Sequence, residues 1–161
     1  MTTTANAGTA HFLATVCGML GHGEVIAVGR LGSEAVRHPR LTKVRGVPSE
    51  EETIAEVRAI VGDDPHALVI IGSGAPAPRL RQEFAAYSPM VRPGSYVVME
   101  NTIYCGHPVW PAYGPSPLDA LRKILIEHGD FMQDTDVERH GLTFNPGGFL
   151  LSLIHISEPT R

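Results

Sequence analysis

A loop after residue 100 holds the side chains best suited to acid–base or nucleophilic chemistry. His107 could act as a general base toward a hydroxyl group, because an unperturbed imidazole group titrates near neutrality. The alternative is a loop histidine held against the backbone. Cys105 lies two residues earlier and could form a thiol nucleophile with His107, but no third group orients such a pair. His107 is therefore the candidate catalytic residue, and the thiol pair is the weaker alternative.

A second candidate is the turn Gly72-Ser73-Gly74-Ala75, which follows a short apolar run. It does not match the G-x-S-x-G pattern of serine hydrolases, because Ile71 occupies the position of the first glycine. An anion could bind at the start of the next helix, although two nearby prolines remove amide donors there. We interpret this segment as a tight strand-to-helix turn.

Alternating helices and strands must position these side chains. Apolar periodicity predicts helices over residues 10–20, 49–61, 79–87 and 117–128, and strands over 24–28, 41–45, 67–71, 95–100, 131–134 and 141–145. Ser49 and Glu52 predict a capping box on the second helix, and Ser116 before Pro117 predicts the start of the fourth. The alternation indicates an α/β fold with a mostly parallel sheet covered on both faces.

The long loop 101–115 is predicted to be a flap on the substrate side of this sheet. Its aromatic residues Trp110 and Tyr113 could pack on a substrate or on the protein itself. His22, in a Gly-His-Gly turn, is expected to be structural.

Bulk properties exclude several classes of protein. The net charge of −4, without a basic block, gives no reason to expect a nucleic-acid partner. The apolar runs are too short for a membrane span, and the N-terminus lacks a signal-peptide pattern. The two cysteines form no CxxC pair, so a reducing compartment and a cytoplasmic location are expected.

The chain length of 161 residues predicts one domain, which we place at residues 8–150. Residues 1–7 are polar and are expected to be a disordered N-terminus, so the first central strand of the sheet is expected to be missing. Residues 151–161 (LSLIHISEPTR) match the translation of a sequencing-library adapter, and we expect them to be an artefact outside the domain. An interrupted sheet edge would make a homo-oligomer plausible.

Three stretches together resemble the cephalosporin hydroxylase and rhamnosyl O-methyltransferase family. They are GHGEVIAV (21–28) with HPRL (38–41), PGSYVVMENT (93–102) with GHP (106–108) and GP (114–115), and LTFNPGGF (142–149). The resemblance implies a Rossmann-like three-layer α/β/α methyltransferase fold. It also implies methyl transfer from S-adenosylmethionine to a hydroxyl of a sugar or secondary metabolite, a small-molecule substrate, and assistance by a divalent metal such as Mg²⁺.

The same resemblance implies that Glu100 and Asn101 are metal ligands, whereas it identifies no cofactor-binding residues. The sequence departs from the family at three acidic positions: Val28-Gly29-Arg30 has no acid, Gly72-Ser73-Gly74 has none, and Asn101 replaces an aspartate. Magnesium needs several oxygen ligands, preferably anionic, so one carboxylate and one amide make a poor site. The missing ribose acceptor would cost about 1–3 kcal/mol.

Two hypotheses therefore stay open. The chain is a degenerate, non-catalytic relative or a partner-binding module of this fold. Alternatively it remains an enzyme, which could be metal-independent, and uses His107 or the proximity of its substrates alone. The missing acids favour the first, and the GHP, GP and LTFNPGG motifs favour the second.

Overall fold

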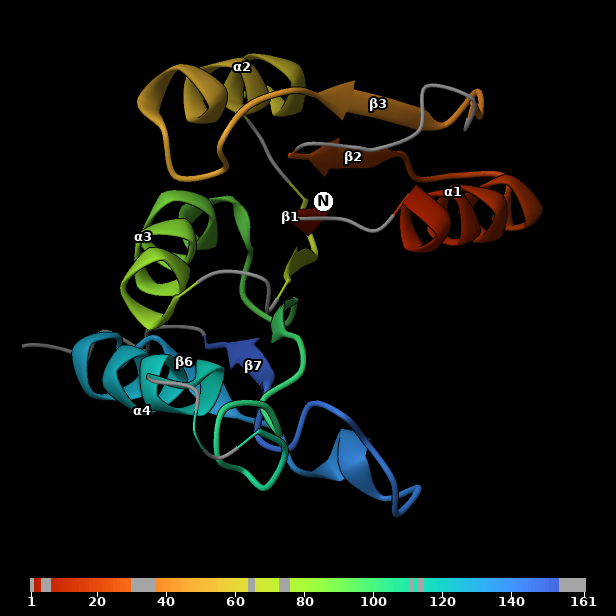
Figure 1. Cartoon of the computed structure of the whole chain (residues 1–161). Coiled ribbons are helices and arrows are strands. Elements are labelled where there is room, and N and C mark those ends of the chain that lie inside the picture. Colours follow the sequence, from red (N-terminus) through yellow and green to blue (C-terminus); the bar gives the residue numbers. More distant parts are fainter. Residues whose placement is uncertain are drawn as a thin grey trace, which may run out of the picture.

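A seven-stranded sheet organises the chain, in the order β3-β2-β1-β4-β5-β7-β6 (Figure 1). The structure, a computed structural model, describes residues 2–3, 7–29, 37–63, 66–72, 76–110, 112 and 115–153. The strands are β1 (Thr2–Thr3), β2 (Val25–Val28), β3 (Leu41–Val44), β4 (Val69–Ile71), β5 (Tyr96–Met99), β6 (Phe131–Gln133) and β7 (Phe149–Ser152). The α-helices are α1 (Ala7–Leu20), α2 (Glu51–Val61), α3 (Ala77–Tyr87) and α4 (Pro117–Glu127), with 3₁₀ turns η1 (Ser88–Met90) and η2 (Asp136–Glu138).

The first five strands are parallel, and β7 is antiparallel to both β5 and β6. This confirms the predicted α/β fold with a mostly parallel sheet. No helix in the described part of the chain is long and apolar enough to cross a bilayer.

The expectation of a missing central strand is wrong. Thr2 and Thr3 form β1 in the middle of the sheet, where Thr2 pairs with Ala27 of β2 and with Ile70 of β4. Two polar residues give no apolar pattern, but threonine is β-branched and suits an extended backbone that is paired on both sides. The expected disorder of residues 1–7 therefore fails at Thr2 and Thr3, and at Ala7, where α1 begins. Residues 1 and 4–6 lie outside the described residues.

Helices cover the two faces of the sheet unequally. Thr3 of β1 pairs with Val28 and with Ile71, Val28 pairs with Val44, and Ile71 pairs with Met99. Because residues that pair across neighbouring strands point to the same face, one face of the sheet carries the side chains of Val28, Val44, Ile71 and Met99. These four side chains belong to the main buried cluster, which also contains residues of α2, α3 and α4.

A second, smaller set of buried residues lies on the opposite face. This set consists of Ala10 and Ala14 of α1, which packs on β2, and of Val25 and Ala27 of β2. None of the four belongs to the main cluster. Within the described residues, α1 is the one helix on this face, and Figure 1 shows it apart from α2, α3 and α4.

Two helix starts differ in how well the sequence predicts them. Helix α2 begins at Glu51 with Glu50 as its N-cap and no side-chain cap, so the predicted Ser49–Glu52 capping box is wrong. The amide of Glu50 donates to the carbonyl of Val47, so a turn around Pro48 delays the helix. In contrast, Ser116 caps α4 as predicted.

The last strand also differs from the prediction. Residues 141–145 form no strand, and the side chains of Leu142 and Phe144 are 84% and 61% exposed. The strand is β7, whose residues are alternately half-buried and buried. Leu151 and Ser152 pair in it, so the sheet extends beyond the predicted boundaries of 8 and 150 at both ends. The adapter origin of residues 151–161 stays a prediction, and residues 154–161 lie outside the described part.

Candidate functional site

Glu100 lies at the carboxyl end of β5, beside the end of β4. Its amide donates to the carbonyl of Ile71 over 2.9 Å, which continues the β4–β5 pairing by one residue. The side chain is half-buried, and this burial raises the pKa of the Glu100 carboxyl above its ordinary value. The carboxyl ends of parallel strands are where α/β folds bind ligands, so the carboxylate stands at the expected edge.

Asn101 turns the chain away from β5. Its backbone is left-handed, with φ of 55°, a conformation that asparagine tolerates better than most residues. The backbone amide of Asn101 donates to the side-chain carbonyl oxygen of Asn145 over 2.7 Å. The next residue, Thr102, is fully buried and donates its hydroxyl to the carbonyl of Pro146 over 2.8 Å. A turn more than forty residues away thus holds the backbone that follows Glu100.

That turn, residues 145–148, also bonds to β5 itself. The amide of Met99 donates to the carbonyl of Gly148 over 2.8 Å, and the amide of Gly148 donates to the carbonyl of Asn145 over 2.8 Å. A Cβ atom at position 148 would lie 2.3 Å from the carbonyl oxygen of Met99, so only glycine fits. We use the name edge clamp for Asn145, Pro146 and Gly148 together with the groups of residues 99–102 to which they are hydrogen-bonded. The sequence analysis named the LTFNPGG motif but did not predict this contact.

His107 lies in the loop that leaves the edge clamp. The amide of Gly106 donates to the carbonyl of Val109, and the amide of Val109 donates to the carbonyl of Ile103, each over 3.0 Å. The peptide bond between His107 and Pro108 is cis, and the imidazole is half-buried. Backbone hydrogen bonds therefore shape this loop.

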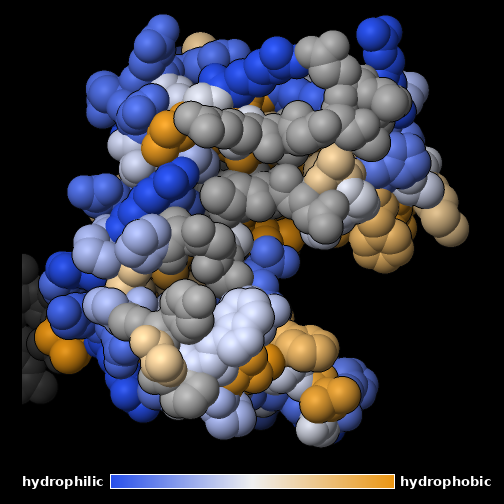
Figure 2. Space-filling model, in the orientation of Figure 1, coloured by the Kyte–Doolittle hydropathy of each residue, from blue (hydrophilic) through white to orange (hydrophobic). Residues whose placement is uncertain are grey.

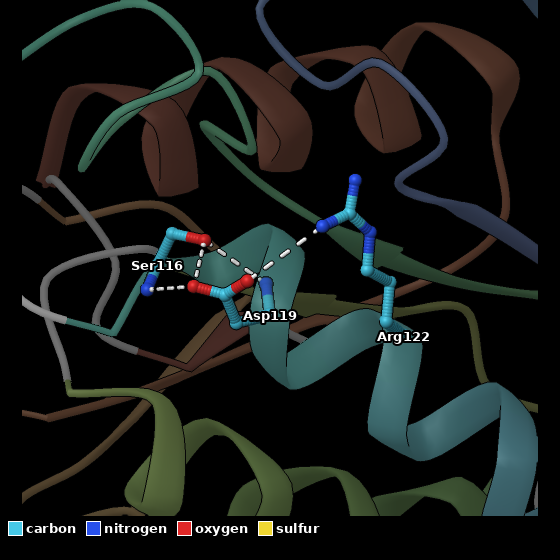
Figure 3. A network of polar contacts seen from close by, with 3 residues as sticks. All are labelled: Ser116, Asp119 and Arg122. Carbon is cyan, nitrogen blue, oxygen red and sulfur yellow. Dashed lines mark hydrogen bonds and ion pairs between the residues drawn. The ribbon is translucent and has the colours of Figure 1, made fainter. Parts of the chain in front are cut away.

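The start of α4 lies close to His107. Ser116 and Asp119 form a reciprocal capping box, and Arg122 Nη1 lies 3.8 Å from Asp119 Oδ1 (Figure 3). Hydrogen bonds from the backbone and hydroxyl of Ser116 hold the pKa of the Asp119 carboxyl below its usual range, and His107 and Arg122 contribute less. The Asp119 carboxylate thus lies in the electrostatic surroundings of His107.

The other candidates gain less from the structure. Cys105 is a half-buried free cysteine. The Trp110 side chain is 59% exposed, and its ring lies 5.2 Å from that of Tyr104. His22 is exposed, so its predicted structural role stays a prediction. Residues 73–75 and Tyr113 lie outside the described residues.

The described residues do not complete a magnesium site. Among them, no three His, Cys, Asp or Glu side chains gather closely enough to hold a metal ion. The edge itself offers the carboxylate of Glu100 and the amide of Asn101, fewer oxygen ligands than Mg²⁺ requires. The donor set therefore does not fit the metal that the resemblance implies.

Comparison with known proteins identifies similar sequences. A family model described as Rhamnosyl O-methyltransferase/CmcI matches residues 2–153. The rhamnosyl O-methyltransferase of Mycobacterium leprae is 31% identical over 121 residues, which cover 73% of this chain and 52% of that protein. The corresponding protein of Mycobacterium tuberculosis H37Rv is 27% identical over 124 residues, covering 75% and 51%. The chain thus spans about half the length of these curated relatives.

Solved structures share the fold. The apo structure of CmcI-N160 has a TM-score of 0.65 and 19% identity, covering 95% of this chain and 63% of that one. MycE methyltransferase from the mycinamycin biosynthetic pathway, in complex with Mg, SAH and mycinamycin VI, has a TM-score of 0.63 and 19% identity, covering 93% and 42%. These likenesses establish a Rossmann-like methyltransferase fold. Because the family model matches nearly the whole sequence, the chain belongs to the Rhamnosyl O-methyltransferase/CmcI family.

Proposed function

We propose that this chain contributes the catalytic edge of an S-adenosylmethionine-dependent O-methyltransferase. The acceptor would be a hydroxyl group of a sugar or secondary metabolite. The observation that carries the proposal is the edge clamp, whose hydrogen bonds to Met99, Asn101 and Thr102 fix the chain on either side of Glu100 at the carboxyl end of β5. Membership of the family supports the reaction class.

The reaction moves a methyl group from the cofactor sulfonium to the acceptor oxygen. One C–S bond breaks and one C–O bond forms, S-adenosylhomocysteine leaves, and the hydroxyl proton must go to a base. We propose His107 as that base, because its imidazole is half-buried in the loop next to the edge and an imidazole nitrogen can accept a proton from a hydroxyl group. Holding the two substrates together would supply the rest of the rate enhancement.

Glu100 and Asn101 remain the proposed metal ligands, but no step of this reaction depends on a metal. Their donors are too few for a complete Mg²⁺ site, as described above. This shortage is the specific observation that favours a second candidate function, a non-catalytic relative or partner-binding module of the same fold. Val28-Gly29-Arg30, which places no acid after β2, favours it as well.

Titration calorimetry against S-adenosylmethionine, with and without magnesium, tests the proposal. The full chain should be used, because Leu151 and Ser152 pair in β7. We expect micromolar binding of the cofactor. A magnesium response that is lost in Glu100→Gln would in addition support Glu100 as a metal ligand. Glu56→Gln, which changes an exposed acid on α2, is the matched control and should bind like the parent.

Absence of heat in either condition, from a chain whose circular dichroism shows it to be folded, would refute the enzyme and support the non-catalytic relative. Binding that is unaffected by magnesium and by Glu100→Gln would refute only the ligand role of Glu100, and the enzyme proposal would stand. Methylation assays would then test His107 directly, since His107→Gln should lower the rate and leave cofactor affinity unchanged.

A further inference from the structure

A projecting loop before β7 exposes large apolar side chains to solvent. Residues 139–146 form this loop, and the amide of Gly147 donates to Oε1 of Glu138 over 2.7 Å, which closes the loop at its base. Figure 1 shows the segment, drawn in blue, extending from the lower part of the molecule away from the sheet. The side chains of Leu142 and Phe144 are 84% and 61% exposed. The loop is therefore held in shape at its base, although most of the surface of these two side chains faces solvent.

Polar and apolar side chains in this loop are inverted relative to an ordinary surface segment. Thr143, which lies between Leu142 and Phe144, is half-buried, and its hydroxyl accepts a hydrogen bond from the amide of Asn145 over 3.0 Å. The polar side chain thus bonds within the loop, whereas the apolar side chains on either side of it face solvent. Figure 2 shows hydrophobic surface on this projecting part of the molecule. Adjacent exposed apolar side chains indicate a site that contacts an apolar partner.

Charged side chains of the same segment differ in whether they are engaged. Glu138 and Asp134 each accept a hydrogen bond from another part of the chain. Arg139 and His140, which directly precede the apolar side chains, are exposed, and their side chains form no ion pair or hydrogen bond with the described residues. Asp136 is also exposed. The solvent-facing part of the loop thus combines apolar side chains with an unengaged guanidinium and imidazole.

A lipid surface fits this arrangement better than a protein partner does. Leu142 projects from a convex loop, so a protein partner would need a matching pocket, whereas a bilayer takes in protruding apolar side chains without one. A long basic side chain such as that of Arg139 can keep its charge among the lipid phosphates while its apolar stem lies deeper. The formal net charge of −4 opposes attraction to anionic lipids. The surface that fits is therefore that of a zwitterionic bilayer.

We propose that this loop is a membrane-docking tip, which inserts Leu142 and Phe144 into the surface of a zwitterionic bilayer and leaves Arg139 at the level of the phosphates. Because Asn145 directly follows Phe144, insertion brings the edge clamp close to the lipid surface. The proposal goes beyond the proposed methyltransferase activity and does not depend on it, so either can fail without the other.

Cosedimentation of the full chain with phosphatidylcholine vesicles, without cofactor or acceptor, tests the proposal. We expect the parent to bind and Leu142→Ser to lower the partition coefficient about tenfold, because it removes apolar surface that enters the bilayer. Adding Phe144→Ser should lower the coefficient further. Ile126→Ser is the matched control, since Ile126 on α4 is also 84% exposed, and it should bind like the parent. Energy transfer from Trp110, the one tryptophan of the chain, to dansyl-labelled lipid gives a second measure of binding.

Four results would overturn the proposal. One is a parent chain that does not bind the vesicles. Another is equal binding by Leu142→Ser and Ile126→Ser, which would mean that the tip has no special role. Binding that needs phosphatidylserine and disappears at high salt would mean that charge attracts the chain. A sedimentation coefficient that falls in Leu142→Ser without vesicles would mean that a second copy covers the tip. Weaker binding in Leu142→Ser, with Ile126→Ser unchanged and both folded by circular dichroism, supports the proposal.

Discussion

Gly148→Ala is the sharpest test of the edge clamp. The new Cβ atom would lie 2.3 Å from the carbonyl oxygen of Met99 and 3.1 Å from that of Asn145. Both are backbone atoms, and Met99 belongs to β5, so neither can rotate away as a side chain could. The turn 145–148 must move instead, and the hydrogen bond between the Met99 amide and the Gly148 carbonyl is strained or lost.

The expected cost follows from these two effects. Overpacking a buried position costs about 1–3 kcal/mol, and a lost backbone hydrogen bond adds about 1 kcal/mol. The free energy of unfolding should therefore fall by about 2–4 kcal/mol, which lowers Tm by roughly 5–15 °C in a chain of this size. Because the same movement shifts the backbone of Asn101 and Thr102, affinity for S-adenosylmethionine should fall too.

Urea denaturation and calorimetry measure both effects. Gly129→Ala is the matched control, because a Cβ atom there would meet nothing within 4 Å, and it should unfold nearly as the parent does. If Gly148→Ala unfolded within about 0.5 kcal/mol of Gly129→Ala, the clash would be relieved at little cost. The turn would then be too soft to position Glu100, and the carrying observation of the proposed function would be lost.

Three further predictions concern the supports of the sheet. Ser116→Ala should lower the free energy of unfolding by about 1 kcal/mol through loss of the α4 cap, measured by urea denaturation; no change would contradict the cap. The pKa of the Asp119 carboxyl is lower in the folded state than in the unfolded state. Its ionised form therefore stabilises the folded chain fully above about pH 4, and this stabilisation is lost as the pH falls through the pKa of the folded state. The difference between the parent and Ser116→Ala should therefore shrink below about pH 4, and a difference that grows there would refute the assignment. Tyr87→Phe should cost about 1–2 kcal/mol in thermal unfolding, since the buried hydroxyl donates to the carbonyl of Pro48 over 2.7 Å, and an unchanged Tm would show that water replaces it.

Patterns within one element were predictable from the sequence. Apolar periodicity placed the helices and most strands within a few residues, and Ser116 with Pro117 located the start of α4. The failures share a cause, which is that a competing local or distant contact decided the structure. A turn around Pro48 displaced the start of α2, and pairing on both sides made a strand of Thr2 and Thr3 without any apolar signal.

The candidate site likewise combines a position that the sequence predicts with long-range contacts that it does not predict. The position of Glu100 at the end of a strand follows from the run that precedes it, and the structure agrees. The contacts of Asn101 with Asn145 and of Thr102 with Pro146 each join residues 44 positions apart. No spacing rule links such positions, since the antiparallel return of β7 beside β5 creates their proximity.

In the edge clamp, the contacts that shape the end of β5 are separate from the acids that would bind a cofactor or a metal. Its bonds join backbone groups, one asparagine side chain and one threonine hydroxyl, and none of them uses a carboxylate. The end of β5 can therefore hold its shape whether or not the neighbouring turns carry acids. The PGSYVVMENT and LTFNPGG motifs of this chain thus have a structural role that does not depend on its chemistry. The acids, by contrast, act only through what they bind, because a carboxylate at these positions would accept hydrogen bonds from ribose hydroxyls or coordinate a divalent ion. It follows that cofactor and metal affinity, rather than fold stability, is the property that the three missing acids should change.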